Sequence, residues 1–241
     1  MASLRKALLL GMLLLGALGF GFWKWREGLT CRRLLVEGAR WVADSSLIRP
    51  LVPALGSPLY GAHLAMWERR LVGHPYLRTV RIRPRLPDAW VIQVQERQPV
   101  ARLAEAPGLY LDDEGRLLPP PERGLPSVPW VRGLGPPYGA GLVRRDTVMR
   151  ALLPWLRWLA AVGPRRALVA EIALYPGPEL VLYTTLGYVP VRVDPERVEE
   201  QWKAFEAFYW QEILPRGGRG FEELDVRYRG QVVARLKEGA H

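Results

Sequence analysis

The residues best placed for chemistry are three consecutive carboxylates, Asp112-Asp113-Glu114, followed by Gly115. Neighbouring carboxylates can bind a hard cation such as Ca²⁺, which prefers oxygen ligands. The alternating ligand spacing of a calcium-binding loop is absent, however, and an acidic run that ends in glycine is more typical of a tight turn between strands. We therefore favour a hairpin turn, and we predict no metal and no other cofactor.

Nucleophiles and general bases are scarce in the rest of the chain. The only cysteine, Cys31, excludes an internal disulfide framework and a cysteine-rich metal site. Three histidines, His63, His74 and His241, are too few and too scattered to suggest a zinc site or a catalytic triad. No glycine-rich phosphate loop follows a predicted strand. The residues therefore suggest no catalytic constellation, and we expect that the protein is not an enzyme.

Positive charge is concentrated in the first 103 residues. The chain of 241 residues has a net charge of +10, whereas residues 104–241 carry eighteen basic and eighteen acidic side chains. Such a basic region suits anionic lipid headgroups, and it is equally typical of a solvated surface in an arginine-rich protein. No nucleic-acid recognition motif accompanies it, so we expect no nucleic-acid partner.

The N-terminal segment is the only apolar stretch of membrane length. The run from Ala7 to Trp23 is uncharged and rich in leucine, and Trp25 follows where aromatic rings favour the membrane interface. We predict a short cytoplasmic tail over residues 1–6 and a transmembrane helix over residues 7–25. The alternative is a signal peptide cleaved near Ala17-Leu18-Gly19, but cleavage there would interrupt the apolar run.

The next seventy residues predict a small α+β module in the order strand, helix, helix, strand, strand. A short strand at residues 33–36 is followed by a helix that begins near Asp44 and by a second helix that ends before Gly73. Residues 77–83 alternate apolar and polar side chains, as a half-buried strand does. A turn is expected to begin at Pro84, and a final strand closes the module.

The elements after this module predict a second sheet with helices. Strands are expected at residues 109–111, 117–118, 169–174, 180–184 and 188–193, with a terminal hairpin of residues 223–228 and 231–236. Residues 119–141 read as a link rich in proline and glycine. One helix is predicted over residues 148–162 with an interruption at Pro154, and another begins with Asp194 as its N-cap and ends near Tyr209.

Several short motifs occur in a fixed order along the chain. They are Val36-Glu37-Gly38, the hinge from Gly56 to Leu59, His74-Pro75-Tyr76-Leu77, Arg85-Leu86-Pro87-Asp88, Glu96-Arg97-Gln98-Pro99-Val100-Ala101, the run from Leu109 to Gly115, and Leu125-Pro126. In this order they resemble the bacterial cell-division family FtsQ, known as DivIB in Gram-positive organisms. The resemblance covers nearly the whole chain, and the run at residues 96–101 is its most specific part.

The resemblance implies both a fold and a location. It implies a POTRA domain over residues 31–102, a β domain over residues 103–237 with a curved, mostly antiparallel sheet and flanking helices, and a tail over residues 238–241. The fold class is thus α+β. The number of basic residues on each side of the apolar segment slightly favours a cytoplasmic C-terminal region. Because long domains are translocated largely regardless of charge, we follow the resemblance and expect both domains on the periplasmic side of the cytoplasmic membrane, at the division septum.

The resemblance also implies a binding site on the terminal hairpin. In the FtsQ family the end of the sheet accepts a strand from FtsB, a small single-span coiled-coil protein, and FtsL is a second partner of this kind. The run from Leu224 to Tyr228 matches the Asp-x-Arg-Tyr sequence that opens this hairpin. Unpaired amides at a sheet edge supply affinity, while the side chains beside the edge supply selectivity.

From this match we expect Tyr228 to anchor the partner and Arg227 to pair with a partner carboxylate. The expected contact set is Val226, Arg227, Tyr228, Arg229, Val232, Val233, Ala234 and Arg235. The alternative is that Val226 and Tyr228 only belong to the core of the sheet.

A basic face on the first module is a candidate second surface. Its members are Arg78, Arg81, Arg83 and Arg85, and a solvated face is the alternative. The implied function is a non-enzymatic scaffold of the division machinery that binds FtsB-like and FtsL-like proteins. The alternative functions are a POTRA-bearing component of polypeptide assembly or transport, which usually carries several POTRA repeats, and a secreted enzyme, for which the sequence suggests no site.

Overall fold

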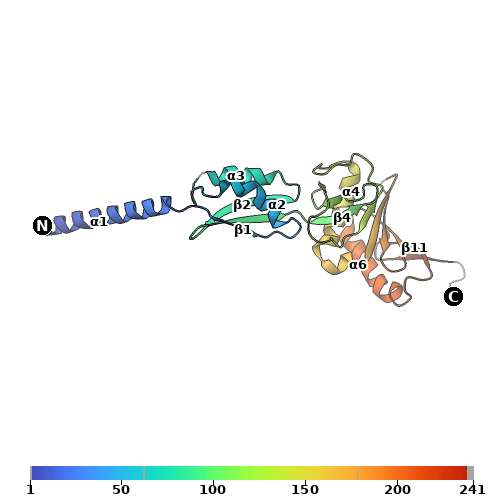
Figure 1. The fold of residues 1–241 in the computed structure, drawn as a ribbon. Helices are drawn as coiled ribbons and strands as arrows, with labels where there is room; N and C mark the ends of the chain where they lie inside the picture. Colours follow the sequence, from blue (N-terminus) through green and yellow to red (C-terminus); the bar gives the residue numbers. More distant parts are fainter. Residues whose placement is uncertain (1, 62, 178, 238–241) are drawn as a thin grey trace. The chain divides into compact units, whose positions relative to one another are not determined.

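The computed structural model describes residues 2–61, 63–177 and 179–237, with only the backbone described for residues 2–9 (Figure 1). The chain divides into two compact units, residues 1–96 and 97–241. Helices and sheets occur in both, so the predicted α+β class is confirmed. The predicted tail at residues 238–241 lies outside the described residues.

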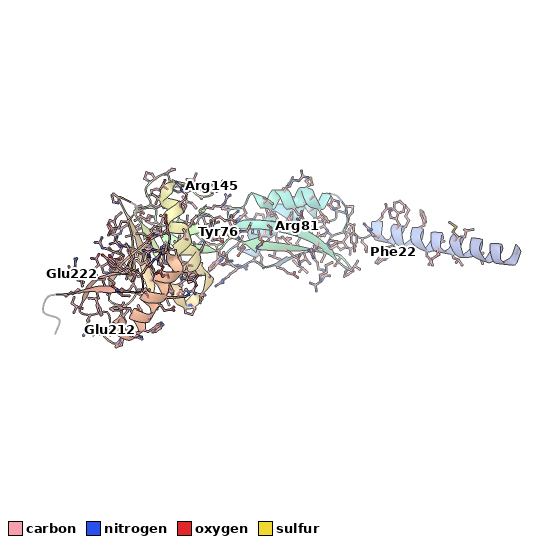
Figure 2. All side chains as sticks on the ribbon, turned by 180° about the vertical axis from the view of Figure 1, so that it is seen from behind. Phe22, Tyr76, Arg81, Arg145, Glu212 and Glu222 are labelled. Atoms are coloured by element: carbon pink, nitrogen blue, oxygen red, sulfur yellow. The ribbon has the colours of Figure 1, made fainter. Side chains whose placement is uncertain are left out.

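Helix α1 spans Ala2–Glu27 and includes the apolar N-terminal run. Large apolar side chains on it are exposed, among them Leu15. Figure 2 labels another of them, Phe22. Over the residues whose side chains are described, no helix is long and apolar enough to cross a membrane. Residues 7–9 of the predicted transmembrane helix lie outside that set, and the prediction for residues 7–25 is not confirmed.

The first unit has the predicted order of strand, helix, helix, strand, strand. Its elements are β1 (Arg33–Glu37), α2 (Asp44–Ile48), the 3-10 helix η1 (Arg49–Ala54), α3 (His63–Val72), β2 (Leu77–Arg85) and β3 (Ala89–Glu96). The sheet order is β1-β3-β2, with β1 parallel and β2 antiparallel to β3. The turn expected to begin at Pro84 starts later, because β2 is an edge strand and an edge tolerates a residue without an N–H.

Glu96 stabilises the end of the first unit. Its side chain is buried, and its carboxylate accepts the backbone N–H groups of Arg40, Trp41 and Val42 at 2.8, 2.8 and 2.9 Å. A buried carboxylate with three N–H donors fixes the loop after β1 against the end of β3. The first residue of the most specific motif thus has a structural role.

The second unit contains a sheet of nine strands. They are β4 (Pro99–Leu103), β5 (Tyr110–Asp112), β6 (Leu117–Leu118), β7 (Trp130–Arg132), β8 (Val169–Tyr175), β9 (Glu179–Thr184), β10 (Pro190–Val193), β11 (Phe221–Asp225) and β12 (Val233–Leu236). Their order is β12-β11-β10-β9-β8-β7-β4-β5-β6. The sheet is mixed, since β11 is parallel to β10 and β7 is parallel to both β4 and β8.

Strand β7 lies inside the segment predicted to be a link. It pairs in parallel with β4 at Arg102 and Trp130, and with β8 at Trp130 and Glu171. Only Val131 is buried, between the exposed Trp130 and Arg132. Three residues next to Pro129 are too short a run to show a two-residue period, which is why the sequence pattern did not reveal the strand.

The helices of the second unit also correct two expectations. They are α4 (Thr147–Ala161), α5 (Gly163–Arg166) and α6 (Val198–Phe208), and a π-helical turn η2 (Tyr209–Ile213) continues α6. Helix α4 is not interrupted at Pro154, and Asp146 caps it by accepting the Met149 N–H at 2.9 Å. Asp194 does not cap α6, because its carboxylate accepts the Glu196 N–H in a turn that precedes the helix.

Helices α4 and α6 pack against one face of the nine-stranded sheet (Figure 1). Fully buried side chains from both helices meet alternate residues of the strands in one core. They include Trp155 and Leu156 from α4, Trp202 and Phe205 from α6, and Ile172, Leu182, Val191 and Leu224 from the sheet. Strand β12 lies at one end of the sheet, and its residue Ala234 packs against this core.

Candidate partner-binding edge

Strand β12 is the terminal strand of the nine-stranded sheet. It pairs antiparallel with β11, and the Lys237 N–H donates to the Gly220 carbonyl at 2.9 Å. Since N–H groups alternate in direction along a strand, those of Ala234 and Leu236 point away from β11. In the part of the chain that the structure describes, neither has a hydrogen-bond partner. The edge therefore offers two free donors.

The other end of the same sheet is covered. Leu117 in β6 donates its N–H to the Leu142 carbonyl at 2.8 Å, and the Gly141 N–H donates to the Leu117 carbonyl at 2.7 Å. The chain after β7 thus pairs with β6 and satisfies its outer groups. Of the two ends of the sheet, β12 is the one that no other described segment covers.

The terminal hairpin is shorter than predicted. Its strands end at Asp225 and begin again at Val233, so Val226, Arg227, Tyr228, Arg229 and Val232 lie in the connection. The Val226 side chain is buried and belongs to the core. Tyr228 is 56% exposed and does not, so the core alternative is correct for Val226 and wrong for Tyr228.

Arg227 is already bonded to a carboxylate within the chain. Its Nε–H donates to Asp225 Oδ1 at 2.9 Å and its Nη2–H to Asp225 Oδ2 at 2.6 Å. The Arg227 backbone N–H donates to the same carboxylate at 3.0 Å. Residues two apart in extended chain share a face, and this brings the two side chains together. The pair braces the connection that carries Tyr228.

The pKa values of Asp225 and Arg227 are consistent with a stable ion pair between them. Burial alone would raise the pKa of Asp225, but the hydrogen bonds from Arg227 outweigh it and lower the pKa below its usual value of 3.8. The pKa of Arg227 is raised, chiefly by its hydrogen bond to Asp225. Both groups are therefore held in their charged forms.

Tyr228 borders two hollows beside the edge. One, of about 630 Å³, is lined by α6 residues that include Lys203 and Ala204, together with Val226. The other, of about 250 Å³, is lined by charged residues and by Val233 of β12. An exposed aromatic ring between two hollows is suited to anchor a partner side chain on either side.

Sequence reasoning named Arg227 and Arg235 of the smaller hollow but missed Arg192 and Glu223. Arg192 forms ion pairs with both Glu179 and Glu223, and Arg235 lies 3.8 Å from Glu223. The alternation in residues 190–193 predicts that Arg192 faces away from the core, but it cannot identify partners on other strands. Along β12, Val233 and Arg235 are exposed, whereas Val232 and Ala234 pack toward the core.

The basic face of the first unit is smaller than predicted. Arg81, Arg83 and Arg85 are exposed on one side of β2, and Figure 2 shows the side chain of Arg81. Arg78 is half-buried and does not belong to this exposed row of arginines. Exposed ion pairs link Arg81 to Glu68 and Arg85 to Glu37 at 3.7 and 3.8 Å.

The edge of β2 is partly capped by helix α3. Glu68 Oε1 accepts the Ile82 backbone N–H at 2.8 Å. Two residues further along, Pro84 occupies the next outward position and has no N–H to offer. An incoming strand would therefore find fewer donors on β2 than its length suggests.

No protein-family model matches the chain. It is 33% identical over 227 residues to the cell division protein FtsQ of Rhodothermus marinus, an alignment that covers 91% of this chain and 81% of that protein. The chain belongs to the FtsQ family of cell division proteins. FtsQ of Salinibacter ruber is 30% identical over 240 residues, with 95% and 90% covered, and FtsQ of Syntrophotalea carbinolica is 24% identical over 212 residues, with 86% and 74% covered.

The family assignment from the ordered motifs is thus confirmed. In this FtsQ-family chain the acidic run forms a turn, as expected, because the buried Asp112 accepts the N–H groups of Glu114 and Arg116 at 2.9 and 2.7 Å. Asp112 also forms an ion pair with Arg97 at 3.0 Å. Among the described residues, no three His, Cys, Asp or Glu side chains gather where they could hold a metal ion.

Proposed function

We propose that this FtsQ-family chain is a non-enzymatic scaffold of the division machinery that binds a partner by adding its strand to β12. The observation that carries the proposal is the β12 edge, where the outward N–H groups of Ala234 and Leu236 have no partner among the described residues. An added strand would pair with both donors and extend the sheet, the mode called β-augmentation. Burial of the apolar side chains beside the edge would add to the affinity.

The partners in this proposal are FtsB-like and FtsL-like single-span proteins, following the match of residues 224–228 to the family's terminal hairpin. The uncharged run from Ala7 to Trp23 would anchor the chain in the cytoplasmic membrane. Both units would then lie on the periplasmic side, at the septum, where they can meet the extracytoplasmic parts of such partners.

Selectivity in this proposal comes from the side chains around β12. Tyr228 would contact the partner directly, since tyrosine loses little conformational entropy on binding and buries a large area. Val233 and Arg235 would contact the partner's side chains on the exposed face of the sheet. Arg227, because it is bonded to Asp225, would hold the connection in place rather than bind a partner carboxylate.

A weaker second surface is proposed on the first unit. The exposed Arg81, Arg83 and Arg85 would attract an acidic segment of another division protein. Since exposed charges contribute more to the association rate than to affinity, we assign this face a steering role.

Site-specific crosslinking in living cells tests the strand-addition proposal. A photoreactive residue at position 228 of the full chain should capture a small single-span division protein, and mass spectrometry of the product would identify the partner segment. The matched control is the same residue at position 188, since Tyr188 is also an exposed tyrosine and lies just before β10, at the opposite end of that strand from Asp225. Equal capture from both positions, or only self-crosslinks at 228, would contradict the proposal.

A further inference from the structure

A groove runs along helix α4 on the side of the second unit that carries the helices. It has a volume of about 1170 Å³ and lies between α4 and the start of α6. The α4 residues that line it recur every three or four positions: Thr147, Arg150, Ala151, Pro154, Arg157, Trp158 and Ala161. This spacing is one face of a helix, so the groove follows α4 over about 21 Å, or four turns.

The floor of the groove is apolar. Ala151 and Pro154 from α4 and Val198 from α6 are half-buried there, with the ring of Trp158 beside them. Small side chains in this position allow the backbone of a ligand to approach α4 closely.

The two walls of the groove carry opposite charge. Arg150 and Arg157 lie on the α4 wall, seven residues or about two turns apart, and both are exposed. The opposite wall carries Glu196 and Glu199, which are also exposed. A ligand that fits must therefore be acidic along one flank and basic along the other.

A helix fits this groove better than an extended peptide. Both long walls come from helices, whose interior backbone groups are already paired within the helix. An extended segment would find no backbone partners there, and its own N–H and C=O groups would depend on side chains and water. A helix satisfies its backbone groups internally and needs only side-chain contacts.

We propose that the groove between α4 and α6 binds an amphipathic helix of a partner protein. The bound face of that helix is narrow and built from small and apolar residues. Carboxylates spaced seven residues apart on one flank pair with Arg150 and Arg157, and a basic flank faces Glu196 and Glu199. This inference does not rest on strand addition at β12, although Glu199 lines both this groove and the larger hollow beside Tyr228.

A designed peptide tests the proposal directly. The probe is a fluorescein-labelled 18-residue helix, about five turns long, with an Ala/Leu face, glutamates seven apart on one flank and lysines on the other. Fluorescence anisotropy with the full chain in detergent should show saturable binding. The double variant Arg150→Glu/Arg157→Glu should weaken that binding about tenfold or more, because two attractive contacts become repulsive.

Two further measurements separate groove binding from bulk charge. The control double variant Arg145→Glu/Arg219→Glu makes the same charge change at exposed positions outside the groove, and Figure 2 shows Arg145. It should leave binding within about twofold of the wild type. A peptide with lysines on both flanks should show the reverse order, binding Arg150→Glu/Arg157→Glu more tightly than wild type.

Filling the groove gives an independent result. Ala151→Trp should abolish binding of the probe, while Tyr228→Ala at the other surface should not change it. The proposal is overturned if the probe does not bind, if Ala151→Trp binds as well as wild type, or if both double variants lose affinity equally. Thermal unfolding of each variant must match the wild type for these outcomes to count.

Discussion

The two units of the molecule each contain an antiparallel edge strand, β2 in the first and β12 in the second, and the two edges differ in their free donors. On β2 the Ile82 N–H is bonded to the Glu68 carboxylate, and Pro84 has no N–H. On β12 the outward N–H groups of Ala234 and Leu236 have no partner in the described part of the chain. The β2 edge is capped at two of its outward positions, whereas the β12 edge is capped at neither of these two.

Open sheet edges promote aggregation because their unpaired backbone groups can bond to strands of other chains. Proteins usually prevent this with prolines, charged side chains or a covering element at the edge. The first unit uses all three devices, with Pro84, the arginines of β2 and Glu68 of α3. The same chain omits the proline and the covering carboxylate at β12. A protein that protects one edge and leaves another free has, we infer, kept the second for a partner.

Arginines alone do not distinguish these two edges. Exposed arginines occur on both strands, at Arg81 and Arg83 of β2 and at Arg235 of β12. The difference lies in a contact between elements, since Glu68 reaches Ile82 from a helix fourteen residues away. Edge availability therefore has to be judged from hydrogen bonds rather than from the composition of the strand.

The largest expected effect comes from closing the open edge. Ala234→Pro removes one outward N–H without removing a ladder bond to β11, because that N–H points away from it. We expect the affinity for an FtsB-like partner to fall about 100-fold, because a hydrogen bond is lost and the proline ring clashes with the added strand. Copurification of the partner with the full chain measures the change.

Ala234→Val is the matched control, since it keeps the N–H and adds a side chain that strands favour. It should bind the partner within about threefold of the wild type. If Ala234→Pro and Ala234→Val retained the partner equally well, β12 would not be the site of strand addition and the contrast between the edges would lose its functional meaning.

The next effect comes from opening the protected edge. Glu68→Ala removes the acceptor of the Ile82 N–H, and we expect the first unit to lose about 1–2 kcal/mol of unfolding free energy. Hydrogen exchange at the Ile82 amide should accelerate. Glu68→Gln keeps an acceptor oxygen and should lie closer to the wild type, so equal exchange in the two variants would show that the cap is not what protects β2.

The sequence predicted where the two edge strands lie better than it predicted the side-chain contacts around them. The alternation in residues 77–83 located β2, and the final apolar runs located the hairpin, although its strands proved shorter. The pairing of Asp225 with Arg227 was within reach, because residues two apart in extended chain share a face. The contact of Glu68 with Ile82 was not, since it depends on how α3 packs on the sheet.

A smaller effect is expected when the carboxylate of Asp225, which pairs with Arg227 beside β12, is removed. The pKa of Asp225 is lowered in the folded chain, so its contribution to stability is complete above its usual pKa of 3.8 and is lost as the pH falls through the lower, folded-state value. Asp225→Asn should therefore cost about 1 kcal/mol of unfolding free energy at neutral pH and progressively less in acid.

Chemical denaturation of the full chain at several pH values measures this difference. Glu222→Gln is the control, because it removes an exposed carboxylate on the same strand, shown in Figure 2. Its cost should stay below about 0.5 kcal/mol at every pH. A constant cost of Asp225→Asn from neutral to strongly acidic pH would mean that the ion pair with Arg227 does not stabilise the connection beside β12.

The smallest effect is expected on the protected edge, where the arginines are exposed. Arg83→Glu should leave crosslinking from position 228 unchanged and should slow association with an acidic division partner about twofold at low salt, with no difference at high salt. Arg219→Glu makes the same charge change in the second unit and is the control. A salt-independent loss of binding with Arg83→Glu alone would make β2 a primary docking surface, and its capped edge would then have to bind through side chains rather than through an added strand.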